Sequence, residues 1–226
     1  MKFDAILFDC DGVLVDSEMI TNQVICDTLN AYGASISVEE TMTVFLGKLL
    51  RDSVEQIIKI IGYIPPESFF KDFLLARDKA LAERVSAIPN ILHFITAIQR
   101  ANIPFAVASG ADLHKMTITL GRTGLLSAFK GLMFGKDNVV RSKPAPDVYL
   151  LAAKTIGVDI NRCVIIEDTV TGVTAGVAAG ATVIGYAGAQ HTDANNLLAA
   201  GACAVIKDIM SLYILFNIPY NISYFE

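Results

Sequence analysis

Two aspartates near the start of the sequence have a spacing that suits chemistry on a bound substrate. Asp9 and Asp11 follow a short apolar run, in the segment Phe8-Asp9-Cys10-Asp11-Gly12. Alternate residues of an extended segment point the same way, so both carboxyl groups could face one substrate. One carboxylate can attack a phosphorus atom as a nucleophile, while the other donates and accepts protons. Aspartate pairs of this spacing are common in loops, so the pair by itself does not define a site.

Five further residues each follow an apolar run or lie in a loop between two elements: Ser109, Gly110, Lys143, Glu167 and Asp168. Ligands of open parallel sheets bind beyond the carboxyl ends of the strands, so we expect these residues to converge on Asp9 and Asp11. Clustered carboxylates repel one another and favour a bound cation, and oxygen ligands suit Mg²⁺. Lys143 and a helix N-terminus expected at Ser109-Gly110 would neutralise a phosphate group. The set therefore predicts magnesium-assisted phosphoryl transfer.

Each of these residues also has a purely structural interpretation. Ser109 could cap a helix, and Lys143 could be a solvated loop lysine. Glu167 and Asp168 could favour the dipole of the helix that follows them. The catalytic interpretation is favoured because every one of these residues lies just past a predicted strand or in an intervening loop.

The elements that must position these residues alternate between short strands and helices. Short apolar runs predict buried parallel strands, at 5–8, 105–108, 131–134, 163–166 and 182–185. Stretches with helical periodicity separate the later strands. Such alternation is typical of an α/β fold with a parallel sheet flanked by helices.

One long stretch departs from this alternation. Apolar residues three to four apart predict helices with no convincing strand between them, over 17–32, 38–45, 50–61 and 68–85. Glycines and a proline pair separate the later helices. We therefore predict a small all-helical domain at 16–86, inserted into a catalytic core that residues 1–15 and 87–226 form.

The composition limits the class of partner. The chain has 226 residues, of which 53% are hydrophobic and 18% charged, with a formal net charge of −5. This is too apolar for a disordered chain, and a mildly acidic protein has no general attraction for nucleic acid or an anionic membrane. The four cysteines lack the spacing of a metal site, which favours reduced thiols in the cytoplasm. We expect a small phosphorylated molecule as substrate, and a monomer or a homodimer.

Two segments are unusually apolar. Residues 169–192 carry no charge, but glycines interrupt them, so we expect a helix, a turn at Gly180 and a strand instead of a membrane span. The tail at 209–226 is more apolar than a free end. It is predicted to pack on the core or on another subunit, and the sequence does not distinguish between these two.

Taken in order along the chain, the polar residues resemble the four motifs of the haloacid dehalogenase-like hydrolase superfamily. The segment 8–17 is similar to the first motif, Ser109 to the second, Lys143 in Ser-Lys-Pro-Ala-Pro-Asp to the third, and Glu167-Asp168 to the fourth. The chain most resembles the branch of β-phosphoglucomutases and small sugar-phosphate phosphatases, including the 6-phosphogluconate phosphatase kind. The resemblance implies a Rossmann-like core with a helical C1-type cap domain inserted after the first motif, in agreement with the helical stretch.

The resemblance also assigns roles. It implies that Asp9 is phosphorylated and that Asp11 acts as the acid and base. The phosphoryl group would be held by Ser109, Gly110 and Lys143. Carboxylates and one backbone carbonyl would hold Mg²⁺, from Asp9, Asp168, the carbonyl of Asp11 and, directly or indirectly, Glu167.

Relatives with other chemistries differ at positions that matter here. Dehalogenases of this fold lack the second aspartate, and phosphonatases replace it and use a cap lysine, for which Lys48 would be the candidate. Asp11 argues against both. β-Phosphoglucomutases have a histidine in the first cap helix, where alignment from Asp9 places Thr21. A threonine cannot act as a base near neutral pH, and the three histidines lie outside the cap region. Hydrolysis is therefore favoured over the mutase alternative.

The cap is expected to recognise the leaving group. Lys48 and Arg51 could bind a polar or anionic group, which favours a sugar phosphate or a phosphogluconate-like substrate, and both could equally be solvated surface residues. The arginine that grips a second phosphate in mutases falls at Leu50 in this chain, next to Arg51. A catalytically inactive binding module is the last alternative, and it is disfavoured because no catalytic group is missing.

Overall fold

The chain divides into two compact units. The computed structural model describes residues 3–45, 50–188 and 192–218. Residues 1–15 and 87–226 form the larger unit, which we call the core unit, and residues 16–86 form the smaller one, the insert unit. These are the ranges that the sequence analysis assigned to the catalytic core and to the cap. That the insert unit acts as a cap remains a prediction.

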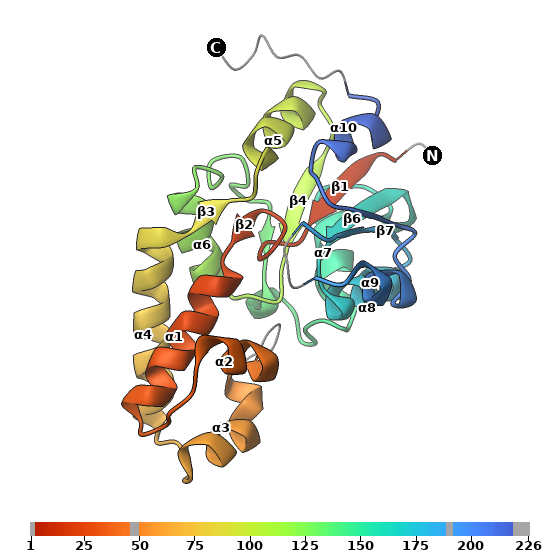
Figure 1. The fold of residues 1–226 in the computed structure, drawn as a ribbon. Helices are drawn as coiled ribbons and strands as arrows, with labels where there is room; N and C mark the ends of the chain where they lie inside the picture. Colours follow the sequence, from red (N-terminus) through yellow and green to blue (C-terminus); the bar gives the residue numbers. More distant parts are fainter. Residues whose placement is uncertain (1–2, 46–49, 189–191, 219–226) are drawn as a thin grey trace. The chain divides into compact units, whose positions relative to one another are not determined.

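A parallel sheet organises the core unit (Figure 1). Within the described residues it has six strands, in the order β5-β4-β1-β6-β7-β8. The strands are β1 (Ala5–Phe8), β4 (Phe105–Ala108), β5 (Met133–Phe134), β6 (Cys163–Glu167), β7 (Thr182–Tyr186) and β8 (Ala204–Ile206). Phe8 is in register with Val107 of β4 and with Ile166 of β6. The last residues of these three strands therefore reach the same edge of the sheet, as the sequence analysis required.

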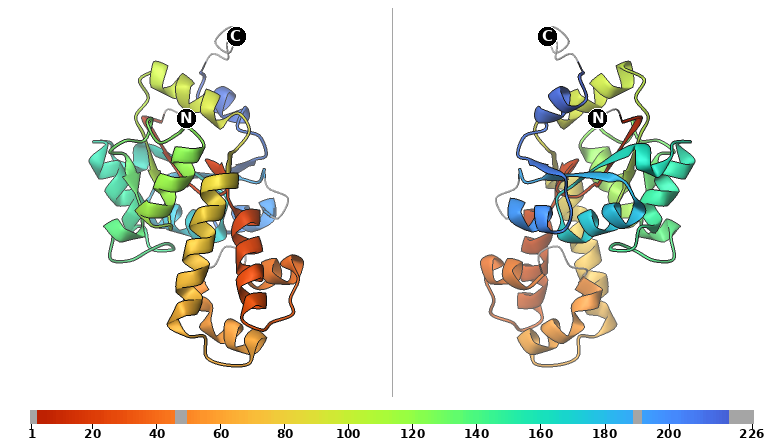
Figure 2. Two further views of the ribbon diagram at one scale, coloured as in Figure 1. Left: turned by 90° about the vertical axis from the view of Figure 1, so that its left-hand side faces the viewer. Right: turned by 90° about the vertical axis from the view of Figure 1, so that its right-hand side faces the viewer.

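Helices cover both faces of this sheet (Figure 2). They are α5 (Ile91–Arg100), α6 (Leu113–Arg122), α7 (Asp147–Thr155), α8 (Val170–Ala179), α9 (Ala194–Ala199) and α10 (Ser211–Leu215), with short 3-10 turns at Lys136–Asn138 and Ile160–Arg162. Leu7 packs in one cluster with side chains of α7 and α8, such as Tyr149 and Val173. Phe8 points the other way and meets Phe94 of α5 at 6.3 Å between ring centroids. Side chains of a strand alternate between the two faces of the sheet. A fully apolar strand such as β1 is therefore stable only where helices pack against both faces.

The apolar tail packs on the core unit as far as residue 218. Ile209 and Leu212 are fully buried there. The Tyr213 ring of α10 lies 5.2 Å from the Phe94 ring of α5, in an edge-on arrangement that aromatic pairs favour. Of the two sequence alternatives, packing on the core therefore applies to residues 209–218. Residues 219–226 lie outside the described part of the chain.

Helices form almost the whole of the insert unit, as predicted. They are α1 (Glu18–Ala31), α2 (Val38–Phe45), a 3-10 turn at Leu50–Ser53, α3 (Val54–Ile61) and α4 (Glu67–Arg84). Their apolar faces share one core, to which Leu29, Phe45, Ile57 and Phe69 contribute buried side chains. Two short strands, β2 (Val15–Asp16) and β3 (Ser86–Ala87), pair in a separate sheet at the points where the chain passes between the units.

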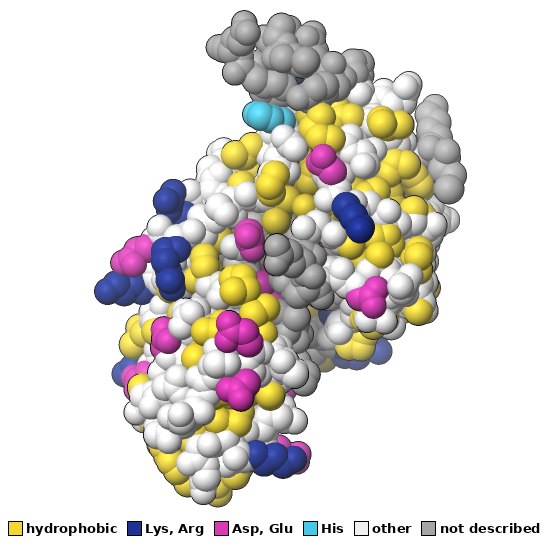
Figure 3. Space-filling model, viewed as in Figure 1, with side chains coloured by type: hydrophobic (Ala, Val, Ile, Leu, Met, Phe, Trp, Pro, Cys, Tyr) yellow, Lys and Arg dark blue, Asp and Glu magenta, His cyan; other side chains and the backbone are white. Residues whose placement is uncertain are grey.

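Helix length and surface charge can both be followed in the described residues. None of the helices there is long and apolar enough to cross a membrane. The uncharged stretch forms helix α8 and strand β7, with Gly180 between them in the left-handed conformation that the predicted turn requires. On the face drawn in Figure 3, the described basic side chains are interspersed with acidic ones instead of forming one large patch.

Candidate active site

Asp9 lies directly beyond the carboxyl end of β1, in the interior of the core unit. Only 6% of its surface is exposed, and its backbone N–H donates a hydrogen bond of 3.0 Å to the Ile166 carbonyl of β6. Gly12 follows with a φ of +79°, which a residue with a side chain rarely adopts. A Cβ atom at Gly12 would also lie 2.0 Å from the Asp168 Oδ2 atom. The glycine therefore permits both the turn and the close approach of Asp168.

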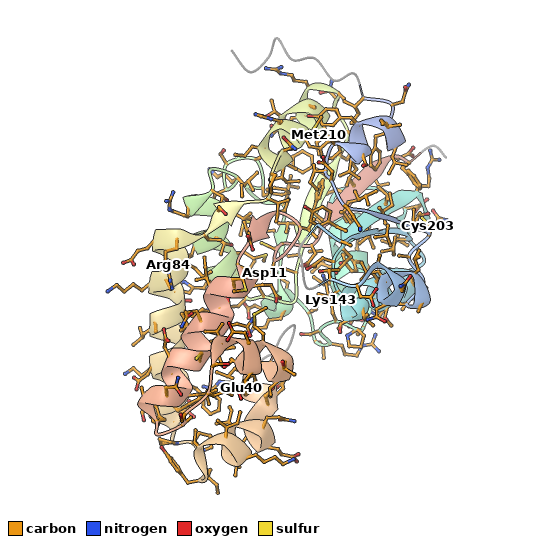
Figure 4. The ribbon with its side chains drawn as sticks, viewed as in Figure 1. Asp11, Glu40, Arg84, Lys143, Cys203 and Met210 are labelled. Atoms are coloured by element: carbon orange, nitrogen blue, oxygen red, sulfur yellow. The ribbon has the colours of Figure 1, made fainter. Side chains whose placement is uncertain are left out.

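Lys143 connects the first motif with the fourth (labelled in Figure 4). Its Nζ atom donates to Asp9 Oδ1 at 2.6 Å, to Glu167 Oε1 at 2.7 Å and to the Tyr149 hydroxyl at 2.8 Å. The side chain is only 7% exposed. Burial on its own lowers the pKa of a lysine, but the carboxylates of Asp9 and Glu167 more than offset this and raise the pKa of Lys143. The structure thus excludes the alternative of a solvated loop lysine.

Glu167 is the last residue of β6 and is completely buried. Its Oε1 atom accepts hydrogen bonds from Lys143 and from the Tyr149 hydroxyl, the latter at 3.0 Å. Its Oε2 atom accepts from the backbone N–H of Thr169 at 2.9 Å and from the hydroxyl of Thr169 at 3.0 Å. A Cβ atom at Gly172 would lie 1.5 Å from Glu167 Oε1, so only glycine fits there. Glu167 is therefore a fixed support for Lys143.

Three buried carboxylates form a group that fits a hard cation. Oxygen atoms of Asp9, Glu167 and Asp168 all lie within 4.8 Å of one another. Burial, with smaller contributions from Glu167 and Asp11, raises the pKa of Asp9 to about 7 against the opposing charge of Lys143. Burial therefore opposes a negative charge on Asp9, and a divalent cation bound between these carboxylates would favour the charged form. An all-oxygen donor set of this kind suits Mg²⁺.

The segment after β4 differs from the prediction in one respect. Ser109 is buried beside the sheet edge, where its N–H donates to the Phe134 carbonyl at 2.9 Å and its Oγ atom accepts from the Ala111 N–H at 3.1 Å. A helix N-terminus at Ser109-Gly110 is wrong, because α6 begins at Leu113 and its N-cap is Asp112. The Asp112 carboxylate accepts a hydrogen bond from the backbone N–H of Lys115, the third residue of α6. This bond fixes the start of the helix at Asp112. Ser109 and Gly110 thus lie in the turn before α6.

Asp11 has a different environment from Asp9. Its carboxylate is not a member of the three-carboxylate group found among the described residues. Instead, its Oδ1 atom lies 2.9 Å from the Nζ atom of Lys115, a residue of α6. Lys115, Tyr149 and Thr169 were not predicted from the sequence. Each lies in a predicted helix or next to one, and nothing in the neighbouring residues indicates which site residue it contacts.

The insert unit contains the remaining predicted residues. Arg51 forms an exposed ion pair of 2.7 Å with Glu67, and its guanidinium group lies 4.9 Å from the centre of the Phe70 ring. Lys48 lies outside the described residues. The Thr21 hydroxyl donates to the Ser17 carbonyl of its own helix at 2.9 Å. The substrate roles of Lys48 and Arg51 stay predictions.

Comparison with known proteins gives the family of this fold and site. Residues 3–180 match the model of the haloacid dehalogenase-like hydrolases. The chain therefore belongs to the haloacid dehalogenase-like hydrolase family. Its parallel sheet flanked by helices is the Rossmann-like core expected from the motifs.

Individual relatives share moderate sequence identity with the chain. The chloroplastic protein SUPPRESSOR OF QUENCHING 1 of Arabidopsis thaliana is 33% identical over 183 residues, which make up 79% of this chain and 17% of that much longer protein. The 6-phosphogluconate phosphatase of Escherichia coli (strain K12) is 26% identical over 84% of this chain and 85% of its own. A crystal structure of a family member from Deinococcus radiodurans R1 contains bound phosphate and sodium. Its sequence is 32% identical to this chain, and the two structures match with a TM-score of 0.81 over 95% of this chain and 96% of the other.

Proposed function

We propose that the chain is a magnesium-dependent phosphomonoester hydrolase that acts on a small phosphorylated metabolite through an aspartyl phosphate on Asp9. The observation that carries this proposal is the contact of the buried Lys143 with both Asp9 and Glu167, next to Asp168. Membership of a hydrolase family, a phosphatase among the relatives and bound phosphate in a related crystal structure all support it.

The residues would divide the reaction between them. Asp9 attacks the phosphorus atom, a bond forms between its carboxylate and phosphorus, and the bond to the leaving oxygen breaks. Asp11 gives its proton to that oxygen. A water molecule then attacks the aspartyl phosphate, Asp11 takes up its proton, and phosphate departs with Asp9 restored. Lys143 and the Ser109 hydroxyl would neutralise and orient the phosphoryl oxygens.

The donor set indicates how a cation would contribute. The carboxylates of Asp9 and Asp168 and the backbone carbonyl of Asp11 would hold Mg²⁺, while Glu167, whose oxygens already accept four hydrogen bonds, would assist indirectly. The chemistry supplied by bound Mg²⁺ is the neutralisation of charge on the phosphoryl group and on the attacking carboxylate.

Hydrolysis is proposed over phosphoryl shuttling because of Thr21. Its hydroxyl is bonded within α1, and no threonine can act as a base near neutral pH.

A sugar phosphate or phosphogluconate-like substrate is proposed from the named activity of the Escherichia coli relative. The test is a set of phosphorylated metabolites, with p-nitrophenyl phosphate as the reference, assayed for phosphate release with Mg²⁺ and with a chelator. Release that does not depend on Mg²⁺, or no release from any compound, would contradict the proposal.

Incubation with β-glucose 1-phosphate and a trace of the 1,6-bisphosphate is expected to yield no glucose 6-phosphate, because the chain lacks the base that would activate the second sugar hydroxyl. The measurement is a coupled assay for glucose 6-phosphate. Hydrolysis of p-nitrophenyl phosphate by the same sample serves as the control for active enzyme. Accumulation of glucose 6-phosphate in place of free phosphate would favour the mutase alternative.

Addition of Mg²⁺ to chelator-treated protein is expected to raise the thermal unfolding midpoint, because a ligand that binds only the folded state stabilises it. At a hundred times the dissociation constant, the gain is about 2.7 kcal/mol. Asp168→Asn should lose most of this shift, whereas Asp159→Asn, an exposed aspartate of the same unit, should keep it. An equal shift in Asp168→Asn would exclude Asp168 as a ligand.

A further inference from the structure

Asp9 and Asp11 are each in contact with a different lysine. Lys143 contacts Asp9, and Lys115 contacts Asp11 with 2.9 Å between Nζ and Oδ1. The Lys115 and Asp11 side chains are 13% and 20% exposed, so the pair is largely shielded from solvent. We propose that Lys115 is a positioning residue that orients the carboxyl group of Asp11 for proton transfer. This inference rests on the proposed function, in which Asp11 is the acid and base.

Helix α6 presents Lys115 from a fixed position. The Asp112 carboxylate accepts a hydrogen bond of 2.8 Å from the Lys115 backbone N–H, and the Leu113 N–H donates to Asp137 at 3.0 Å. One turn further on, Thr119 Oγ1 lies 4.0 Å from the sulfur atom of Cys10, the residue between the two aspartates. Residues four apart share a helix face, so the face that packs on the first motif also carries Lys115.

The position of Asp11 explains why it needs such a partner. Its carboxylate lies outside the group formed by Asp9, Glu167 and Asp168, so the cation proposed for that group would not orient it. An aspartate side chain can adopt several rotamers, and proton transfer requires one of them. A charge-assisted hydrogen bond to Oδ1 selects a single orientation of the carboxyl group before the substrate binds.

The consequence is specific to the leaving group. When the bond between phosphorus and the leaving oxygen breaks, that oxygen takes a proton from Asp11. A nitrophenolate is stable enough to leave without this proton. Unsubstituted phenol, whose hydroxyl resembles that of tyrosine with a pKa of about 10, depends on it much more. A variant that disorders Asp11 should therefore discriminate between p-nitrophenyl phosphate and phenyl phosphate, which differ little in shape.

The test measures kcat/KM for both compounds in Lys115→Met, since this parameter reports the steps up to phosphorylation of Asp9. We expect the value for phenyl phosphate to fall on the order of tenfold further than the value for p-nitrophenyl phosphate. Asp11→Asn should show the same bias. The double variant should be no worse than Asp11→Asn alone, because the two residues act as one unit. Lys115→Arg should recover most of the loss by restoring the charge.

Lys136→Met is the matched control, because Lys136 pairs with Asp112 at the start of the same helix, at 3.5 Å. It should leave the ratio of the two kcat/KM values unchanged. The inference would be overturned if Lys115→Met lost the same factor of kcat/KM for both compounds, or changed only KM. It would also be overturned if the losses of kcat/KM in the double variant were additive. If Asp9→Asn stays active or wild type releases no phosphate, the proposed function fails, and the Lys115 inference falls with it. If wild type releases phosphate, Asp9→Asn does not, and Lys115→Met leaves the ratio of the two kcat/KM values unchanged, the Lys115 inference alone fails.

Discussion

Asp9→Asn is expected to reduce the magnesium-dependent hydrolysis of p-nitrophenyl phosphate by about a thousandfold or more, as the loss of a nucleophile does in enzymes whose catalytic groups act as a unit. The amide has nearly the shape of the carboxylate and keeps an oxygen within reach of Lys143, which lies 2.6 Å from Asp9 Oδ1. It lacks the negative charge and the nucleophilicity needed to form the aspartyl phosphate. The measurement is steady-state phosphate release, and the unfolding midpoint of each variant confirms folding.

Asp4→Asn is the matched control for this prediction. Asp4 stands just before the opposite end of β1, where it pairs with Arg162 on the surface of the core unit. That variant should keep wild-type turnover. Wild type quenched with acid during turnover should carry phosphate on the peptide that contains Asp9, and Asp9→Asn should not. If Asp9→Asn kept most of its magnesium-dependent turnover, another nucleophile would have to be sought.

Much of the fold followed from local patterns in the sequence. The four-residue apolar runs at β1 and β4 were predicted with their observed bounds, because both strands are buried on both faces and leave no polar position inside. Helix α2 was predicted equally closely. Strand β8 and helix α9 were not predicted, because Ala204–Ile206 and Ala194–Ala199 are too short for their periodicity to stand out.

The candidate site could be predicted only in part, for a physical reason. Residues at strand ends, such as Asp9 and Glu167, meet because parallel strands bring their carboxyl ends to one edge. Tyr149 and Lys115 approach these residues from helices. The periodicity of a helix predicts which of its faces is buried, but not which residues of other elements that face contacts. The start of α6 was misplaced because Asp112, three residues after Ser109, is the residue whose side chain caps the helix. Such contacts depend on tertiary packing, which periodicity does not encode.

Lys143→Met is expected to affect stability as well as activity. The side chain is 7% exposed and donates to Asp9 and Glu167 at 2.6 and 2.7 Å. Methionine fills a similar volume but leaves two buried carboxylates without their cation, and removal of one partner of a buried ion pair costs about 3 kcal/mol of unfolding free energy. Turnover should fall on the order of a hundredfold or more, because a charge that stabilises the transferring phosphoryl group is lost. The measurements are urea unfolding without metal and phosphate release with Mg²⁺.

The controls separate the charge of Lys143 from its contact geometry. Lys154→Met, on the exposed side of α7, should change the unfolding free energy by less than about 0.5 kcal/mol. Lys143→Arg should not restore activity, because a planar guanidinium group cannot reproduce three ammonium hydrogen bonds that point to Asp9, Tyr149 and Glu167. Mg²⁺ should recover part of the lost stability of Lys143→Met, since it brings positive charge back to the same carboxylates. If Lys143→Met were as stable as wild type and within tenfold of its turnover, Lys143 would be neither the electrostatic partner of Asp9 nor a part of the catalytic group.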